Sequence, residues 1–520
     1  MKKTINHLEQ KSLKKPSRGM LYIGIGIAAI VIGLGIALRL VETLTGNYVF
    51  GFDQGLDFLA ARSIAVDHKI TLIGSEAGAG FAGLPGVFHG PGYRYILSVL
   101  LAISSGNPYG AIVFLGLLSV ILLWVLFRLS DSIFGRNVGY ATLILAAVSM
   151  PLIGQGRMVW APNFSGLVAV PFLFVLWKSQ KNAPWYIFLA AFLASFLYHF
   201  EIPMAAPAVL ASFLYFLFVT KNRSLFGWGM YGVGILLGFL PMLLFEFRHG
   251  WGLVKGLLTY GSRIGQASTA MPFYPLKELL GDGSALFTTI RESFHIGVPW
   301  LSMIFPVMLL GAACIFAYFE KKKDIKQYMT ALLLLVGSHL LVYYPYRGPV
   351  YSHYLSLLYF VYPLIGAYVA IKALSIEKTR LIVYVLGLLM FIEVLSLFPK
   401  TIMYDYADYG GTAKIRGKID AIDAIYEHAA GTGFNIQIFT PPVLPHAYDY
   451  ILLWYAAQKY GYTPGRSLSG TVYLLIEPDP EKPWSYNGWL ETVIKTGEVE
   501  SRWKLPSGFM IEKRFMKGAL

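Results

Sequence analysis

The chain has 520 residues, of which 56% are hydrophobic and only 14% charged, with a mean hydropathy of +0.56. A water-soluble globule cannot bury so much apolar surface, so we predict that a bilayer solvates most of it. The formal net charge of +14 comes from short Lys and Arg clusters between apolar runs, which argues against the continuous basic face of a nucleic-acid-binding protein. The single cysteine, Cys314, excludes an intrachain disulfide and a multi-cysteine metal site.

A helix needs about 20 mostly apolar residues to cross a hydrocarbon core about 30 Å thick. By this rule the sequence predicts about eleven spans, several of them short, and the two around Glu201 could form one broken hairpin. The spans lie near residues 21–40, 108–128, 138–153, 162–178, 184–198, 203–220, 226–245, 298–319, 328–345, 354–371 and 381–398. The predicted fold is mainly α: a polytopic transmembrane helical domain followed by a soluble C-terminal α/β domain.

The basic residues predict the orientation, because Lys and Arg near the ends of spans favour the cytoplasmic side. The N-terminal arm is basic, and so is every loop that alternation places on the same side as this arm. Those loops contain Arg128, Arg136, Lys178, Lys181, Lys221, Arg223, Lys321, Lys322, Lys323, Lys326, Lys372, Lys378 and Arg380. No clear small-x-small cleavage site follows the first span, so we expect an uncleaved anchor. The chain is predicted to be a multi-pass protein of the cell membrane with its N-terminus in the cytoplasm.

The same alternation divides the chain into a cytoplasmic arm (1–20), a membrane domain (21–399) and an extracytoplasmic domain (400–520). Two long loops, 41–107 and 246–297, are expected on the outer face as well. In the terminal domain the apolar spacing predicts helices over 415–426 and 446–459, and strands over 435–439 and 471–476. Its aromatic residues, among them Trp454, suit contact with sugars or with a membrane surface, and core packing is the alternative.

The first outer loop carries two carboxylates, Asp53 and Asp57, one helical turn apart. If a helix begins here, both point the same way and flank one site at the membrane surface. The alternatives are that Asp53 only caps this helix and that Asp57 is a solvated helix residue. Glycines between positions 74 and 86 would let the backbone approach a ligand, or would simply form an irregular loop. His89, which follows, could be no more than a local hydrogen-bonding residue.

Five further motifs carry polar residues. They are HGPGYRY from His89, RMVWAPN over 157–163, LYHFE ending at Glu201, FEFRH ending at His249, and SHYL over 352–355. With the basic arm, the first span and the acidic outer loop, this order resembles the GT-C class of membrane glycosyltransferases. Within that class it is most similar to bacterial members of the dolichyl-phosphate-mannose–protein mannosyltransferase family. The resemblance covers about residues 20–400, although each motif alone is degenerate.

The resemblance implies a glycosyltransferase that moves a hexosyl or pentosyl group from a polyprenyl phosphate to an acceptor hydroxyl on the outer face, with inversion. The family's acidic motif, often Asp-Glu, corresponds here to Asp53 and Gln54, so Asp53 holds the position of the catalytic base. A carboxylate beside an acceptor hydroxyl can remove its proton as attack develops. Gln54 replaces the second acid, so the chain departs from the family's acidic motif at the position whose acid could bind a metal. No cofactor is predicted, although an isolated Asp site could recruit a divalent cation.

The departing prenyl phosphate is negatively charged and needs cationic partners at the outer interface. The candidates are Arg157, Arg248, His249 and Arg347; the other predicted substrate-binding residues are Asp57, His89, His199, Glu201 and His353. Each basic residue could instead be an interfacial side chain or a member of an interhelical ion pair. The expected partners are a polyprenyl-phosphate-sugar donor, a protein, lipid or glycan acceptor, and the bilayer.

Two other functions fit many spans with polar motifs. A transporter or flippase of lipid-linked glycans often shows paired repeats and broken helices at mid-depth, whereas this chain shows no clear repeat and its polar motifs gather on one face. A non-catalytic membrane assembly protein would use the outer domain to bind a partner, and only the first-loop motif argues against it.

Overall fold

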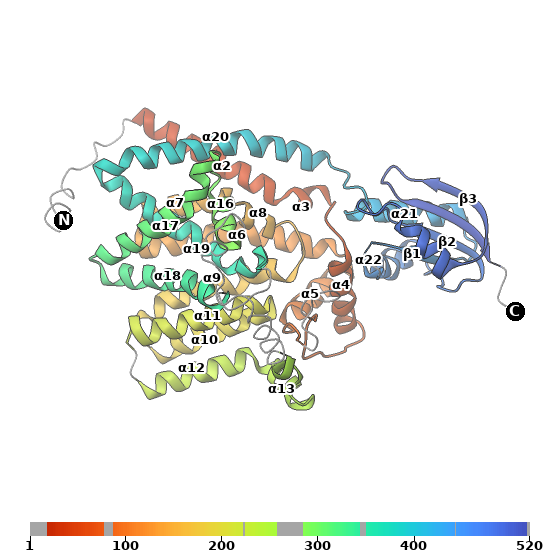
Figure 1. Cartoon of the computed structure of the whole chain (residues 1–520), viewed down its shortest axis with the longest axis horizontal. Helices are drawn as coiled ribbons and strands as arrows, with labels where there is room; N and C mark the ends of the chain where they lie inside the picture. Colours follow the sequence, from red (N-terminus) through yellow and green to blue (C-terminus); the bar gives the residue numbers. More distant parts are fainter. Residues whose placement is uncertain are drawn as a thin grey trace, which may run out of the picture.

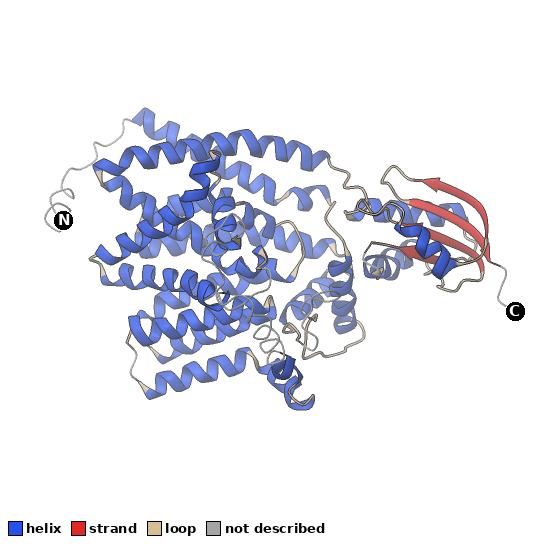
Figure 2. Ribbon diagram, viewed as in Figure 1, coloured by secondary structure: helices blue, strands red, loops and turns tan. Residues whose placement is uncertain are grey.

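The structure is a computed structural model in which residues 18–76, 87–181, 183–221, 224–256, 284–343, 350–441 and 444–516 are described. A bundle of long helices forms most of the molecule, and a small domain with a sheet projects from one end of it (Figures 1 and 2). The predicted class, mainly helical with a C-terminal α/β part, is confirmed.

Each predicted span corresponds to a helix or to a pair of helices. The bundle helices are α2 (Arg18–Arg39), α6 (Tyr109–Phe134), α7 (Arg136–Val148), α8 (Met150–Gln155), α9 (Gly166–Lys178), α10 (Pro184–Phe196), α11 (Ile202–Leu214), α12 (Leu225–Gly238), α13 (Leu240–Arg248), α16 (Ala285–Phe294), α17 (Pro299–Phe319), α18 (Lys323–Tyr343), α19 (Ser356–Ser375) and α20 (Glu377–Ala407).

The structure does not reproduce the predicted count of eleven spans when its helices are judged by length and composition. Within the described residues, seven helices are long and apolar enough to cross a membrane, or eight if the bent pair α12 and α13 counts as one span. The remaining predicted spans are interrupted or short. The segment predicted at 138–153 is divided between α7 and α8, and the part of α2 over 24–39 and the helical segment 184–199 are apolar but shorter than 18 residues. The chain is a multi-pass membrane protein.

Small residues let these helices approach each other closely. A Cβ on Gly234 of α12 would lie 2.5 Å from the Phe188 carbonyl oxygen of α10, and one on Gly238 would overlap the Ser195 hydroxyl. Helices in lipid gain little from hydrophobic exclusion, so close van der Waals packing at small residues supplies much of their association energy. The α10–α12 pair is therefore a tightly packed part of the bundle.

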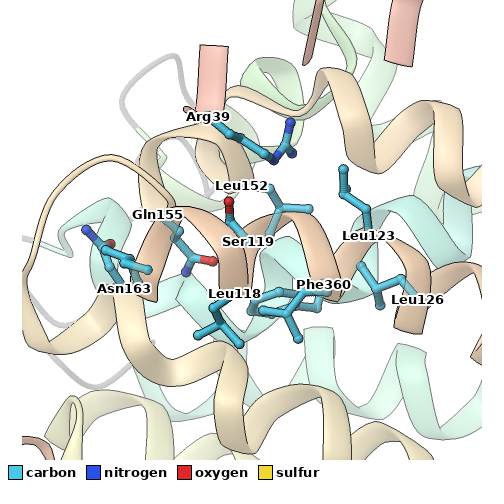
Figure 3. A pocket seen from close by; sticks show the side chains of 11 residues that line it. Arg39, Leu118, Ser119, Leu123, Leu126, Leu152, Gln155, Asn163 and Phe360 are labelled. Carbon is cyan, nitrogen blue, oxygen red and sulfur yellow. The ribbon is translucent and has the colours of Figure 1, made fainter. Parts of the chain in front are cut away.

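Arg39, at the end of α2, is completely buried among the helices. Its guanidinium donates to the carbonyl oxygens of Ala146 (2.6 Å) and Ala147 (2.5 Å), which belong to the last turn of α7. That turn is the negative end of the α7 dipole, so it compensates the charge. Figure 3 shows Arg39 at the edge of a small cavity whose other polar residues are Ser119, Gln155 and Asn163. Arg39 thus caps the C-terminal end of α7, at the point where the helical segment is interrupted before α8.

The loop between α2 and α6 contains three helices: α3 (Val41–Thr45), α4 (Phe52–Ala65) and α5 (Gly92–Ile103). Its start pairs with the segment that follows α20, because Val49 forms a bridge with Lys414 and the side-chain amide of Asn47 donates to the carbonyl oxygens of Asp408 and Tyr409. The first loop is therefore fastened to the terminal domain by its backbone and by the Asn47 side chain.

The terminal domain packs helices against a four-stranded sheet of order β1-β2-β4-β3. Its elements are α21 (Ile415–Ala429), β1 (Asn435–Phe439), α22 (His446–Ile451), a π-helical turn (Leu452–Ala456), α23 (Ala457–Tyr460), β2 (Gly470–Ile476), α24 (Ser485–Trp489), a second π-helical turn (Leu490–Ile494), β3 (Glu498–Lys504) and β4 (Met510–Met516). β1 and β2 are parallel, and the other pairs are antiparallel. The predicted helices and strands are present, whereas β3 and β4 were not predicted.

Candidate functional site

Helix α4 presents the acidic pair of the first loop. Gly51 is its N-cap residue, and the Gln54 side chain accepts a hydrogen bond from the Gly51 N–H (3.0 Å) while donating to the Val159 carbonyl oxygen (3.1 Å). The sequence suggested Asp53 as a possible cap of this helix, but the Gln54 side chain caps its N-terminus. Gln54 also joins α4 to the RMVWAPN segment. Both ends of the Gln54 amide are occupied by the backbone.

The two carboxylates of α4 have different surroundings. Asp53 is exposed, and its side chain makes no hydrogen bond or ion pair with any residue that the structure describes. Asp57 is buried and lies 3.6 Å from Nε of Arg94 on α5. Partial removal of water raises the pKa of Asp53. Burial raises the pKa of Asp57 to about 6, although Arg94 opposes the shift.

His89, Glu201 and His353 meet where the first loop crosses the ends of the spans. Glu201 Oε1 lies 3.1 Å from Nε2 of His89, and Oε2 lies 4.0 Å from Nε2 of His353. Nδ1 of His89 faces the Ser75 carbonyl oxygen at 3.1 Å, so both ring nitrogens face acceptors, which favours the doubly protonated ring. Burial lowers the pKa of His89, but Glu201 and the Ser75 carbonyl outweigh it and raise the pKa overall. The surroundings of His89 thus favour its imidazolium form.

The HGPG segment packs directly on the ring of His199. Nδ1 of His199 accepts the Gly92 N–H at 3.1 Å, and Nε2 donates to the Gly238 carbonyl oxygen at 3.1 Å, so this histidine is neutral. A Cβ on Gly90 would lie 2.2 Å from Nδ1, and one on Gly92 would lie 2.9 Å from the His199 Cβ. The glycines therefore let the loop lie flat against the histidine that joins it to α12.

Arg157 lies apart from this cluster, in a partly buried ion network. Its guanidinium donates two hydrogen bonds to Glu42 (2.7 and 2.8 Å), and its Nη1 lies 2.7 Å from Oδ2 of Asp405. Glu42 follows the first span and Asp405 lies near the end of α20. The carboxylates of Glu42 and Asp405 thus compensate the positive charge of Arg157. Its guanidinium is bound mainly by these two protein side chains.

The FEFRH segment lies beside the start of the HGPG segment. The Phe245 ring contacts the Phe88 ring (5.7 Å between centroids) and stacks on His249 (3.9 Å). Arg248 and His249 are exposed at the end of α13, whereas the buried Glu246 accepts backbone N–H groups of Leu253 and Val254. Glu246 therefore caps the N–H groups of the segment that follows α13. Arg347 lies outside the described residues.

An apolar groove leads from the bundle to this cluster. It encloses about 670 Å³ between α11 and α12, and Val87 and Tyr198 are among its lining residues. The Tyr198 hydroxyl donates to the Phe88 carbonyl oxygen, so the groove ends beside His89. Its other lining residues are Ile202, Ala205, Ala206, Val209, Leu210, Phe213, Tyr231, Ile235, Phe239, Met242 and Leu253.

The structure brings together most of the predicted substrate-binding residues: Asp57, His89, His199, Glu201 and His353. It adds two residues that the sequence analysis missed, Arg94 beside Asp57 and Trp160, whose ring contacts His353 (4.6 Å). Both residues lie within motifs that the sequence analysis quoted, HGPGYRY and RMVWAPN. The motifs were therefore recognised, but these two residues were not predicted to belong to the site. Among the described residues, no three His, Cys, Asp or Glu side chains are placed to hold a metal ion.

The comparisons with known proteins agree with the resemblance. The family model described as dolichyl-phosphate-mannose-protein mannosyltransferase matches residues 88–245, which contain HGPGYRY, RMVWAPN and LYHFE and extend into FEFRH. No curated protein matches the chain. The predicted resemblance to the GT-C class of membrane glycosyltransferases, and within it to this mannosyltransferase family, is confirmed.

Two solved structures are similar to this chain over nearly its whole length. The oligosaccharyltransferase of Archaeoglobus fulgidus, in complex with Zn and sulfate, gives a TM-score of 0.49 at 12% identity and covers 94% of this chain and 73% of its own. ArnT of Cupriavidus metallidurans, bound to undecaprenyl phosphate, gives 0.39 at 13% identity and covers 96% and 98%. Both scores are below 0.5, so neither structure carries an argument about this chain.

Proposed function

We propose that this protein is a glycosyltransferase that moves a sugar from a polyprenyl-phosphate donor to an acceptor hydroxyl on the outer membrane face. The observation that carries the proposal is the apolar groove of about 670 Å³ that ends beside the partly buried His89–Glu201 pair. A prenyl tail needs a long apolar channel and its phosphate needs a polar end, and this juxtaposition supplies both. Residues 1–20 would be cytoplasmic, 21–399 the membrane domain and 400–520 the extracytoplasmic domain.

In this proposal the acceptor oxygen attacks the anomeric carbon while the bond from that carbon to the phosphate oxygen breaks, which inverts the configuration. The bonding electrons leave with the prenyl phosphate, and the acceptor proton passes to Asp53. An exposed carboxylate without a protein partner, as Asp53 is among the described residues, is available to an incoming hydroxyl. Its raised pKa strengthens it as a base.

The leaving phosphate would be stabilised by the cations at the end of the groove. His89 would contribute a positive charge in its imidazolium form, and Arg248 and His249 lie on the neighbouring segment. Arg157 is the weakest of the predicted phosphate ligands, since two carboxylates already compensate it. Glu201, His353 and Trp160 would surround the sugar, and the acidic Glu201 would also keep His89 protonated.

The test incubates purified protein with polyprenyl-phosphate-linked sugars and follows loss of the donor. Asp53→Asn should lower turnover by about 10²- to 10⁴-fold, the usual contribution of a positioned general base. Asp67→Asn, at an exposed acid beyond the same helix, is the matched control and should turn over normally. Unchanged turnover in Asp53→Asn would refute the base assignment. A donor that crosses the bilayer without being consumed would indicate a flippase.

A further inference from the structure

A second cavity lies between the first loop and the terminal domain. It encloses about 320 Å³ between the last turn of α4, the end of α5 and the α22 region. Two hydrogen bonds close the joint: the Tyr450 hydroxyl donates to the Gly106 carbonyl oxygen (2.6 Å), and the Gln458 amide donates to the Ser105 carbonyl oxygen (3.2 Å). The cavity is therefore part of a fixed contact between two parts of the chain.

Arg62 is the charged side chain that lines this cavity. It is half-buried, and within the described ranges it forms no ion pair and its guanidinium makes no hydrogen bond. Its position in the last turn of α4 complements the helix dipole, but that effect leaves all five guanidinium donors unused. A second donor is also unused, because the indole N–H of Trp454 is buried without a partner among the same residues. The cavity therefore offers donors and positive charge to an anion.

The cavity lies near one end of a helix that is long and apolar enough to cross a membrane. Gly106 lies three residues before α6, which is a helix of membrane-spanning length. Exposed apolar residues stand at its edge: Val66 (56%) and Leu453 (42%) line it, and Ile103 (78%) is next to the lining residue Ala102. Trp and Tyr rings beside an Arg, with apolar side chains exposed around them, are typical of the boundary between headgroups and acyl chains.

From these observations we infer that the cavity binds the anionic headgroup of a phospholipid on the side of the bilayer that faces the terminal domain. The phosphate accepts hydrogen bonds from Arg62, and the acyl chains lie against the exposed apolar residues. Arginine forms paired, charge-assisted hydrogen bonds with phosphate oxygens, which a generic basic surface does not. The bound lipid would fasten the joint between α4–α5 and the terminal domain to the membrane.

The experiment uses the full chain in detergent with Cys314→Ser and an environment-sensitive fluorophore on Leu453→Cys at the cavity edge. Three ligands are titrated: phosphatidylglycerol, phosphatidylcholine and free glycerol phosphate. We expect a saturable response to phosphatidylglycerol, at least about tenfold weaker for the other two. Glycerol phosphate binding as tightly as the lipid would show a site for free anions and overturn the lipid assignment, and equal binding of phosphatidylcholine would overturn the role of charge.

Three variants test the site itself. Arg62→Gln should weaken phosphatidylglycerol binding about tenfold, and Ala102→Phe, which fills the cavity from an exposed position, should do the same with the charge intact. Lys69→Gln removes an exposed positive charge seven residues from Arg62 and should bind as the parent does. Equal weakening by Lys69→Gln would show general attraction to a basic surface and refute a built site. Binding is read without turnover, so it stands or fails independently of glycosyl transfer.

Discussion

At the level of single residues, the ring of His199 fixes what can stand in the HGPG segment. Gly90 and Gly92 both contact it, and both ring nitrogens are hydrogen-bonded to backbone. The loop, the end of α10 and the middle of the α12–α13 bend are thus joined through one side chain. A substitution at either glycine should therefore disturb the packing of the loop, of α10 and of the α12–α13 bend.

We therefore expect Gly90→Ala to lower both stability and activity. The added Cβ would lie 2.2 Å from Nδ1 of His199, and relieving such an overlap in a packed site costs about 1–3 kcal/mol. Thermal unfolding in detergent and donor turnover measure the two effects. Gly154→Ala is the control, because a Cβ there meets nothing within 4 Å. A Gly90→Ala protein as stable as the control would refute the contact.

The His89–Glu201 pair should make stability depend on pH. The folded pKa of His89 is raised above its ordinary value of about 6.5, so its contribution is complete below pH 6.5 and is lost as the pH rises through the folded pKa. The difference in melting temperature between parent and His89→Gln should therefore be largest near pH 6 and shrink at alkaline pH. Glu201→Gln should abolish most of this dependence. A difference that grows with pH would contradict the assignment.

At the level of elements, α4 holds the acidic pair against the terminal domain. A Cβ on Gly55 would lie 2.2 Å from the backbone nitrogen of Ala447 in α22, and the Phe52 ring contacts His446 (5.0 Å). The position of Asp53 therefore depends on a domain that begins only at residue 400 of the chain. This contact could not be read from the sequence, because no pattern in either segment names its partner.

Gly55→Ala should separate α4 from α22. Alanine in a helix interior normally stabilises by about 1 kcal/mol relative to glycine, so a loss here would report the contact. We expect faster proteolysis of the terminal domain and reduced turnover. Gly311→Ala in α17, where a Cβ meets nothing within 4 Å, should be neutral or slightly stabilising. Unchanged proteolysis in Gly55→Ala would show that the contact contributes nothing.

Sequence reasoning succeeded where a local pattern sufficed. The spacing of Ile415, Ile419 and Ile422 predicted α21, and the helix of the acidic pair appears where it was expected. It failed where the partner is distant or the pattern is weak. β3 has little apolar alternation and was missed, and the interruption of the span 138–153 at Ser149 was not predicted. The ion pairs of Arg157 with Glu42 and Asp405 could not be predicted, because both partners are distant in the sequence.

At the level of the whole molecule, the basic loops predict which face each end of the bundle meets. The terminal domain and the N-terminal end of α2 lie at opposite ends of the bundle (Figure 1). The arrangement is thus compatible with an N-terminus inside and residues 400–520 outside. The site residues His89, Glu201 and Asp53 would then all face the outside.

Cysteine labelling tests this orientation, since Cys314 is the single native thiol. On a Cys314→Ser background, Glu481→Cys in the terminal domain should react with a membrane-impermeant maleimide in intact cells. Lys322→Cys, between α17 and α18, should react only after the membrane is opened. Both positions are exposed in the fold, so access depends on the side of the membrane alone. The opposite pattern would refute the orientation and, with it, transfer on the outer face.

The Arg157 network has a consequence for how the protein is made. Glu42 leaves the ribosome early and Asp405 only after nearly all the membrane helices, yet Arg157 contacts both in the finished fold. Until α20 inserts, Arg157 and Glu42 form an incomplete pair, and the backbone partners of Asn47 and Val49 do not yet exist. The first loop can reach its final shape only when the last helix arrives. The acidic site is thus completed at the end of synthesis, and a chain that stops before Asp405 would remain unfinished at its beginning.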